Sequence, residues 1–347
     1  MSRQRLILRI VVGVILSAIA VSLPFVNSAE NNQIFSQVLY IALAAMGLNL
    51  LTGFNGQVSI GHGAFFGIGA FTSAILVRKY GWYLEATLPV AAFLSALVGV
   101  AIGFPALRVK GVYLGLITLG LAVLFPPVAR KIVLTDWINA PGGVPLLQPR
   151  TKEVQSLISG LDADQYQYFV TLAVVAVLFL VASNLMRSRA GRAMIAVRDQ
   201  EVAASTVGVN VAGVKVASFA ISAAYAGVAG SLSVLVDRVA DASNPIVYFQ
   251  RSIEFLVAVV IGGAATMTGP LIGAAVLVAI KRFFDDSEAA APALLGIALI
   301  AVVFVLPDGF VGAIRRLTNR FIDTNDPEPP SNSNVVPATV NPPAAST

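Results

Sequence analysis

The segment at residues 187–213 is polar and rich in arginine, although a long apolar stretch lies on each side of it. The guanidinium groups of Arg192 and Arg198 and the carboxylate of Glu201 can form charge-assisted hydrogen bonds to a partner. Small residues follow Glu201 and would let a short helix lie deep in a partner's groove: Ala203, Ala204 and Gly208. The pattern predicts a docking element. The alternative is that the arginines only anchor a cytoplasmic loop between two spans.

A second chemically unusual segment, residues 53–70, combines closely spaced glycines with polar side chains, namely Asn55, Gln57, Ser59 and His62. Glycine weakens a helix interior. A polar, broken stretch within a bilayer is tolerated only where protein buries it or where it lines a wet cavity. Residues 261–274 form another glycine-rich break, interrupted by Pro270. Broken segments in corresponding places of two halves point to a transport pathway between pseudo-repeats.

Two interpretations of these breaks stay open. Their polar groups can border a pathway, or they can form local hydrogen bonds that hold the break together. The pathway candidates are Asn55, Gln57, Ser59, His62, Glu254, Gly262 and Gly263. Packing between neighbouring helices explains other glycines better, and we assign Gly67, Gly69 and Gly273 to it.

Glu254 needs separate treatment, because a carboxylate within a membrane span is costly unless it is paired or wet. Arg251 lies one turn earlier, which predicts an interfacial ion pair, with a pathway role as the alternative. His62 is the only histidine and has no companion ligands, so no metal site is expected.

The composition defines the class of protein. The 347 residues are 57% hydrophobic and 12% charged, with a mean hydropathy of +0.82, which indicates an integral membrane protein. There is no cysteine, so disulfides and thiolate metal sites are excluded. The net charge of +5 does not indicate nucleic acid binding, because the cations lie in short loops beside apolar spans.

Several chemical activities are disfavoured. The chain has no phosphate-binding loop of the GxxxxGK[ST] type, and no HExxH or GxSxG motif, so we expect neither ATP hydrolysis nor other catalysis and no cofactor. Acidic residues within the spans are too sparse for a proton relay, which disfavours an autonomous secondary carrier. A receptor or scaffold would leave the glycine-broken spans unexplained.

The apolar segments predict an all-α membrane protein with about ten spans, with eight or nine as alternatives. We place the spans near residues 7–26, 33–52, 59–77, 84–106, 111–131, 166–186, 214–236, 252–266, 269–283 and 290–307. An even number puts both termini in the cytoplasm, and the arginine-rich loop supports that orientation. The first span is expected to be retained; a cleaved signal peptide is the alternative.

The spans define a transmembrane domain at residues 1–323. The outer loop at 132–165 is expected to be a connector, with partner contact as the alternative. A tail at 324–347, rich in Pro, Asn, Ser and Ala, is expected to be disordered in the cytoplasm.

Several blocks of the sequence resemble a known family. Gly191-Arg192, Arg198 and the run from Glu201 to Gly208 resemble the coupling motif of ABC importer permeases. GLNLLTG at 47–53, followed by GQVSIGHGAFFG at 56–67, is similar to the LivM branch of branched-chain amino acid importers. The segments YL…TL at 113–119, VIGG at 260–263 and TGP at 268–270 fit the same pattern, so the resemblance covers residues 38–312.

The resemblance implies a permease with two pseudo-repeated halves in the plasma or inner membrane, with residues 187–213 as the loop that couples it to ATPases. Its implied partners are a second, LivH-like permease, two cytoplasmic ATPases and an external solute-binding protein. The implied substrates are leucine, isoleucine and valine. Relatives that carry urea, short amides or other amino acids remain the alternative, because specificity rests largely with the binding protein.

Overall fold

A computed structural model describes residues 18–109, 111–131, 144–145, 161–241, 244, 246–283, 296–297 and 309–313. The expected tail at 324–347 and most of the expected spans at 7–26 and 290–307 lie outside these residues. Within them the chain is helical apart from turns and one short strand pair, in which Val144–Pro145 (β1) runs antiparallel to Val239–Ala240 (β2).

The remaining eight expected spans each correspond to a helix. Their bounds are α2 (Ala29–Leu48) continued by the π-helix η1 (Asn49–Phe54), α3 (His62–Tyr80), α4 (Leu84–Ala106), α5 (Val112–Val128), α6 (Ala163–Arg187), α9 (Val211–Asp237), α10 (Val247–Gly262) and α11 (Gly269–Phe283). Five of these, α2 with η1, α4, α5, α6 and α9, are long and apolar enough to cross a membrane. The expectation of an all-α membrane protein is therefore confirmed.

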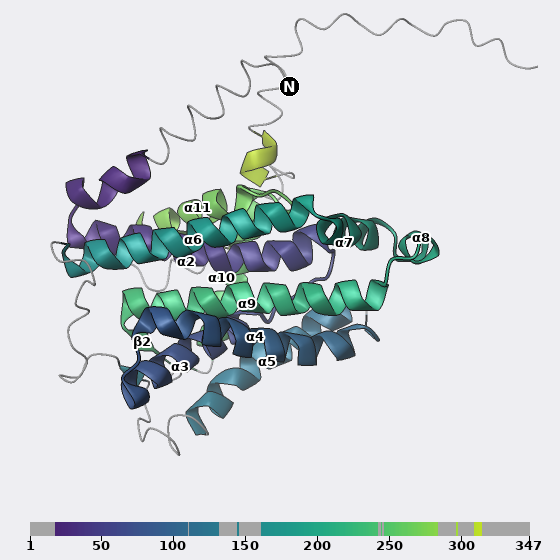
Figure 1. Cartoon of the computed structure of the whole chain (residues 1–347), viewed down its shortest axis with the longest axis horizontal. Helices are drawn as coiled ribbons and strands as arrows, with labels where there is room; N and C mark the ends of the chain where they lie inside the picture. Colours follow the sequence, from purple (N-terminus) through teal and green to yellow (C-terminus); the bar gives the residue numbers. More distant parts are fainter. Residues whose placement is uncertain are drawn as a thin grey trace, which may run out of the picture.

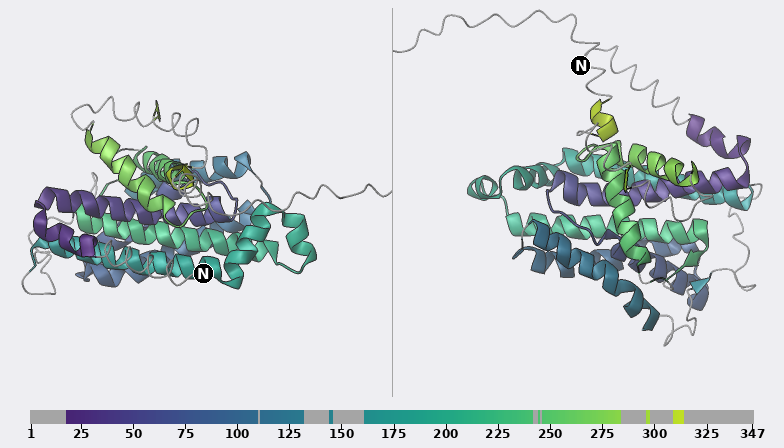
Figure 2. Two further views of the ribbon diagram at one scale, coloured as in Figure 1. Left: turned by 90° about the horizontal axis from the view of Figure 1, so that it is seen from above. Right: turned by 180° about the vertical axis from the view of Figure 1, so that it is seen from behind.

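The long helices α2, α6, α9 and α4 lie side by side, and α7 (Arg189–Asp199) and α8 (Glu201–Thr206) project at one end of them (Figure 1). The inclined helix α11 packs against α10 and α2, at an angle to the long helices (Figure 2). We call the end with α7 and α8 the docking end.

Helix α9 is the centre of the bundle and packs against α4, α3 and α2. In its most apolar stretch 83% of the residues are buried, against 17% in α6. Small residues make this contact possible, because a Cβ on Gly69 would lie 1.9 Å from the carbonyl oxygen of Gly227. Gly67 meets Phe125 and Tyr248, and Gly273 meets the backbone of Ala258. The assignment of these three glycines to packing is confirmed.

Candidate functional site

The predicted docking segment folds as two short helices. Ser188 caps α7 by accepting hydrogen bonds from the backbone N–H groups of Ala190 and Gly191 at 3.2 and 3.4 Å. The buried face of α7 consists of Gly191, Met194 and Val197, spaced one turn apart. This face fixes α7 against the bundle, while Arg192 stays exposed and its Nη1 donates to the backbone oxygen of Arg187 at 3.0 Å.

Helix α8 turns apolar side chains away from the protein. Val202 and Val207 are 74% and 79% exposed, Ala203 is exposed, and Ala204 alone of the helix is buried. Gly208 follows α8 with φ +86°, a conformation that favours glycine, and an added Cβ there would meet no atom within 4 Å. A protruding helix with exposed valines and small residues has the surface that a partner's groove requires.

Glu201 has a role that the sequence did not indicate. Its carboxylate forms an ion pair with Lys215 at the start of α9, and the Lys215 side chain is 8% exposed. Glu201 therefore ties α8 to the bundle in this conformation.

The first predicted break lies directly beside the docking segment. The π-helix η1 ends at Phe54, and α3 begins only at His62. The polar side chains between them are buried, with no more than 5% exposure. Among the described residues, each retains at least one polar atom without a hydrogen-bond partner: Asn55 Nδ2 and Oδ1, Gln57 Oε1, Ser59 Oγ and His62 Nδ1.

Each such atom costs about 1–3 kcal/mol when it stays unpaired, so a cluster of them indicates a place that receives water or a polar ligand. Other atoms of the same residues do hold the break together. Gln57 Nε2 donates to the backbone oxygen of Lys215 at 3.3 Å, and His62 Nε2 lies 2.8 Å from Ser222 Oγ. These hydrogen bonds support the interpretation that the polar groups hold the break together, and the pathway role of the same residues stays a prediction.

The two breaks are in contact, although the residues that join them, Asn49 and Thr266, lie 217 positions apart in the sequence. Asn49, fully buried in η1, donates from Nδ2 to the backbone oxygen of Thr266 at 2.8 Å. Its Oδ1 accepts a hydrogen bond from the backbone N–H of Ala265 at 2.8 Å. One amide side chain therefore satisfies two backbone groups of the second break, which begins where α10 ends, at Gly262.

Gly262 and Gly263 shape this second break. A Cβ on Gly262 would lie 1.8 Å from the carbonyl oxygen of Gly269, and Gly263 has φ +109°. Close approach and backbone conformation therefore require glycine at both positions, and their role in the pathway stays a prediction.

Arg198 connects the docking segment to the first break. Its Nη1 donates to the backbone oxygen of Gly53 at 3.2 Å, and its side chain packs against Gly56. One junction at the docking end therefore joins three features that lie far apart in the sequence: α7, the first break and the second break. Asn49 completes it and was missed by the sequence analysis, although a lone amide just before a break was a usable signal.

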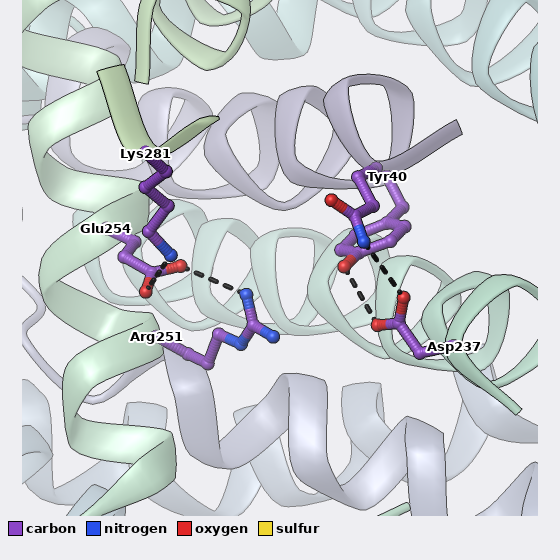
Figure 3. Close-up of polar contacts among 6 residues, drawn as sticks. Tyr40, Asp237, Arg251, Glu254 and Lys281 are labelled. Atoms are coloured by element: carbon purple, nitrogen blue, oxygen red, sulfur yellow. Dashed lines mark hydrogen bonds and ion pairs between the residues drawn. The ribbon is translucent and has the colours of Figure 1, made fainter. Parts of the chain in front are cut away.

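Glu254 lies apart from this junction, in a charged cluster between α10, α11, α2 and α9 (Figure 3). Its carboxylate pairs with Arg251 at 3.1 Å and with Lys281 at 2.5 Å, so the expected ion pair with Arg251 is confirmed. Beside it, Asp237 accepts hydrogen bonds from Tyr40 at 2.9 Å and from Gln37 at 3.4 Å. Sequence analysis singled out neither Tyr40 nor Asp237.

A bundle of apolar helices with two broken segments in contact beside a protruding helix has the architecture of a membrane transport permease. Comparison with known proteins specifies it further. Residues 32–306 match the family model for the permease component of branched-chain amino acid transport systems, and the chain belongs to this family.

Individual relatives agree with the family match. The chain is 30% identical to the high-affinity branched-chain amino acid transport system permease protein LivM of Salmonella typhimurium, over 86% of this chain and 74% of the relative. It is 29% identical to LivM of Escherichia coli, over 87% and 75%. It is also 26% identical to the permease protein LivH of Escherichia coli, over 78% and 91%. No solved structure shows a significant match.

The buried polar cluster of the first break leads to a labelling prediction. The parent chain has no cysteine, so single cysteines at Gln57 and Ser59 can be followed without background. We expect their reactivity with a polar maleimide to differ between nucleotide-free and ATP-trapped complexes, because a pathway changes its hydration as it opens. Reactivity that is low and equal in both states, in a complex that still transports, would contradict a pathway role.

Proposed function

We propose that the chain is the LivM-like permease subunit of an ATP-driven importer of leucine, isoleucine and valine. The observation that carries this proposal is the exposed α8 with its outward-facing Val202 and Ala203. Helix α7 and Arg198 connect it to the first broken segment, and Asn49 connects that segment to the second. Such a connection lets a partner that moves α8 change the conformation of the pathway. The names of the relatives supply the substrate class.

In this proposal the domain at residues 1–323 pairs with a second, LivH-like permease in the plasma membrane, and two cytoplasmic ATPases dock on residues 187–213. The docking end faces the cytoplasm, as do both termini and the tail at 324–347, and an external solute-binding protein meets the opposite end. The ATPases hydrolyse ATP, and the permease itself catalyses no reaction.

The alternative substrates are urea, short amides or other amino acids. They are distinguished from branched-chain amino acids by uptake measurements with the reconstituted complex. An autonomous secondary carrier is distinguished by the same assay, because it would transport without ATPase partners.

The docking surface is tested by Val202→Glu. We expect loss of ATPase binding and at least about tenfold slower uptake, because a charge would be buried in an apolar groove without a partner. Val202 contacts little of its own chain, so the fold should persist. Co-purification and uptake in proteoliposomes measure the two effects. Val202→Ile, which keeps the surface apolar, serves as the control, and full ATPase binding by Val202→Glu would refute docking through α8.

The proposed orientation is tested by impermeant maleimide in right-side-out vesicles. A cysteine at Gln200, exposed beside α8, should react only after the membrane is opened. A cysteine at Tyr83, which is 65% exposed at the opposite end, should react in intact vesicles. The reverse pattern would invert the topology.

A further inference from the structure

A polar cavity of about 390 Å³ lies between α2, α10 and α11, away from the docking end. One wall is a single face of α2, because its residues follow the three- and four-residue spacing of a helix: Glu30, Gln33, Ile34, Gln37, Tyr40 and Ile41. The opposite wall includes Arg251 and Lys281. The volume is within the range of small-molecule sites, about 300–1,000 Å³.

The cavity reaches into the depth of the membrane. Tyr40 is eleven residues into α2, about 16 Å from its start at a rise of about 1.5 Å per residue. Ionisable groups inside a span are costly, and where they occur they typically line a substrate route. In the proposed orientation the cavity extends from the external end of α2 toward the middle of the bilayer, where an arriving substrate would enter.

The charged wall of the cavity places two cations, Arg251 and Lys281, near two carboxylates, Glu254 and Asp237 (Figure 3). Arg251 and Lys281, whose side chains are 28% and 33% exposed, share the single carboxylate of Glu254, which is 13% exposed. Among the described contacts, the Arg251 guanidinium uses only Nη1 for a hydrogen bond, to Glu254. Figure 3 shows its other end directed toward Tyr40 and Asp237. The guanidinium donors that no described contact uses favour a carboxylate ligand, and the neighbouring carboxylates favour a ligand that also carries a positive charge.

The other walls fit the rest of an amino acid. Gln37 lines the cavity and donates through Nε2 to Asp237, so its amide oxygen can accept a hydrogen bond from an ammonium group near the negative charge of Asp237. Ile34, Ile41 and Val278 line the same cavity and provide aliphatic surface.

We propose that this cavity is an entry site for aliphatic α-amino acids, in which Arg251 binds the carboxylate and Gln37, oriented by Asp237, accepts the ammonium group. The inference rests on the proposed function and narrows its substrate class, because urea and simple amides have no carboxylate for Arg251. Lys281 keeps Glu254 paired if Arg251 is removed, so the site can be altered without leaving a lone carboxylate.

The test uses a cysteine at Gln33, which is exposed and lines the cavity, in the complete complex without added binding protein. Leucine should slow its reaction with a charged thiol reagent in a concentration-dependent manner, whereas leucinamide should not. A cysteine at Asn31, exposed but not part of the cavity wall, should be indifferent to both. Absence of protection by leucine up to its solubility limit would overturn the proposal.

Two further variants separate binding from a merely structural ion pair. Arg251→Gln should raise the half-protecting leucine concentration at least about tenfold, the effect expected for a lost charge-assisted hydrogen bond. Glu254→Gln breaks the same ion pair but keeps the guanidinium, so protection by leucine should persist. Equal loss of protection in both variants, or none in Arg251→Gln, would overturn the assignment of Arg251. A parent complex that imports no amino acid would instead refute the proposed function.

Discussion

Replacing Arg198 with methionine is expected to slow amino acid uptake at least about tenfold while the partner ATPases continue to hydrolyse ATP. Arg198 makes the direct hydrogen bond between α7 and the first break, at the backbone oxygen of Gly53. A hydrogen bond to a charged group contributes about 1.5–3 kcal/mol, and its loss would let α7 move without the break. Both rates are measured in the same proteoliposomes: amino acid uptake should fall, and ATP hydrolysis should continue.

Arg189 provides the matched control. It begins the same helix and is exposed, and the described residues offer it no contact with either break. Arg189→Met should therefore keep the ratio of substrate imported to ATP hydrolysed. If both variants lower this ratio equally, the positive charge of α7 matters rather than the contact with Gly53.

Replacing Gly69 with alanine is expected to destabilise the permease by about 1–3 kcal/mol, the usual cost of overpacking a tight core. The added methyl group would lie 1.9 Å from the carbonyl oxygen of Gly227, so α3 and α9 would have to separate. Thermal unfolding of the purified protein, followed by its intrinsic fluorescence, measures the change.

Gly120→Ala is the corresponding control, because the space around Gly120 in α5 is open. Alanine there should stabilise the helix by up to about 1 kcal/mol. Equal unfolding midpoints for the two variants would contradict the prediction. They would show that α3 and α9 can move apart to accept a methyl group at little cost in stability.

The sequence predicted the helical architecture well because membrane spans are long apolar runs with distinctive length. It also located both breaks, since glycine clusters with polar residues are unusual in such runs. It could not predict that Asn49 joins the breaks, because that contact depends on how α2 packs against the turn at 263–268. Nor could it predict the partner of Glu201, since nothing in the spacing distinguishes Lys215 from a distant cation.

The charged cluster illustrates the same limit. Arg251 and Glu254 lie one turn apart on a helix, so their ion pair followed from local geometry. Lys281, Asp237 and Tyr40 come from three other helices, and only the packing of these helices brings them into one cluster (Figure 3). A hydrogen bond between Tyr40 and Asp237 spans 197 residues of sequence.

The contrast between α9 and α6 limits how the family can diverge. Helix α9 is mostly buried, and a Cβ at Gly227 or Gly230 would lie 2.2 Å from Ser95 Oγ or 1.9 Å from the carbonyl oxygen of Phe66, so only glycine fits at these positions. Most of α6 faces outward, where any apolar side chain serves. Evolutionary drift should therefore be fast and chemically permissive along α6. Substitutions along α9 should be rare. Among distant relatives, residue size at its positions should be conserved more strongly than hydrophobicity.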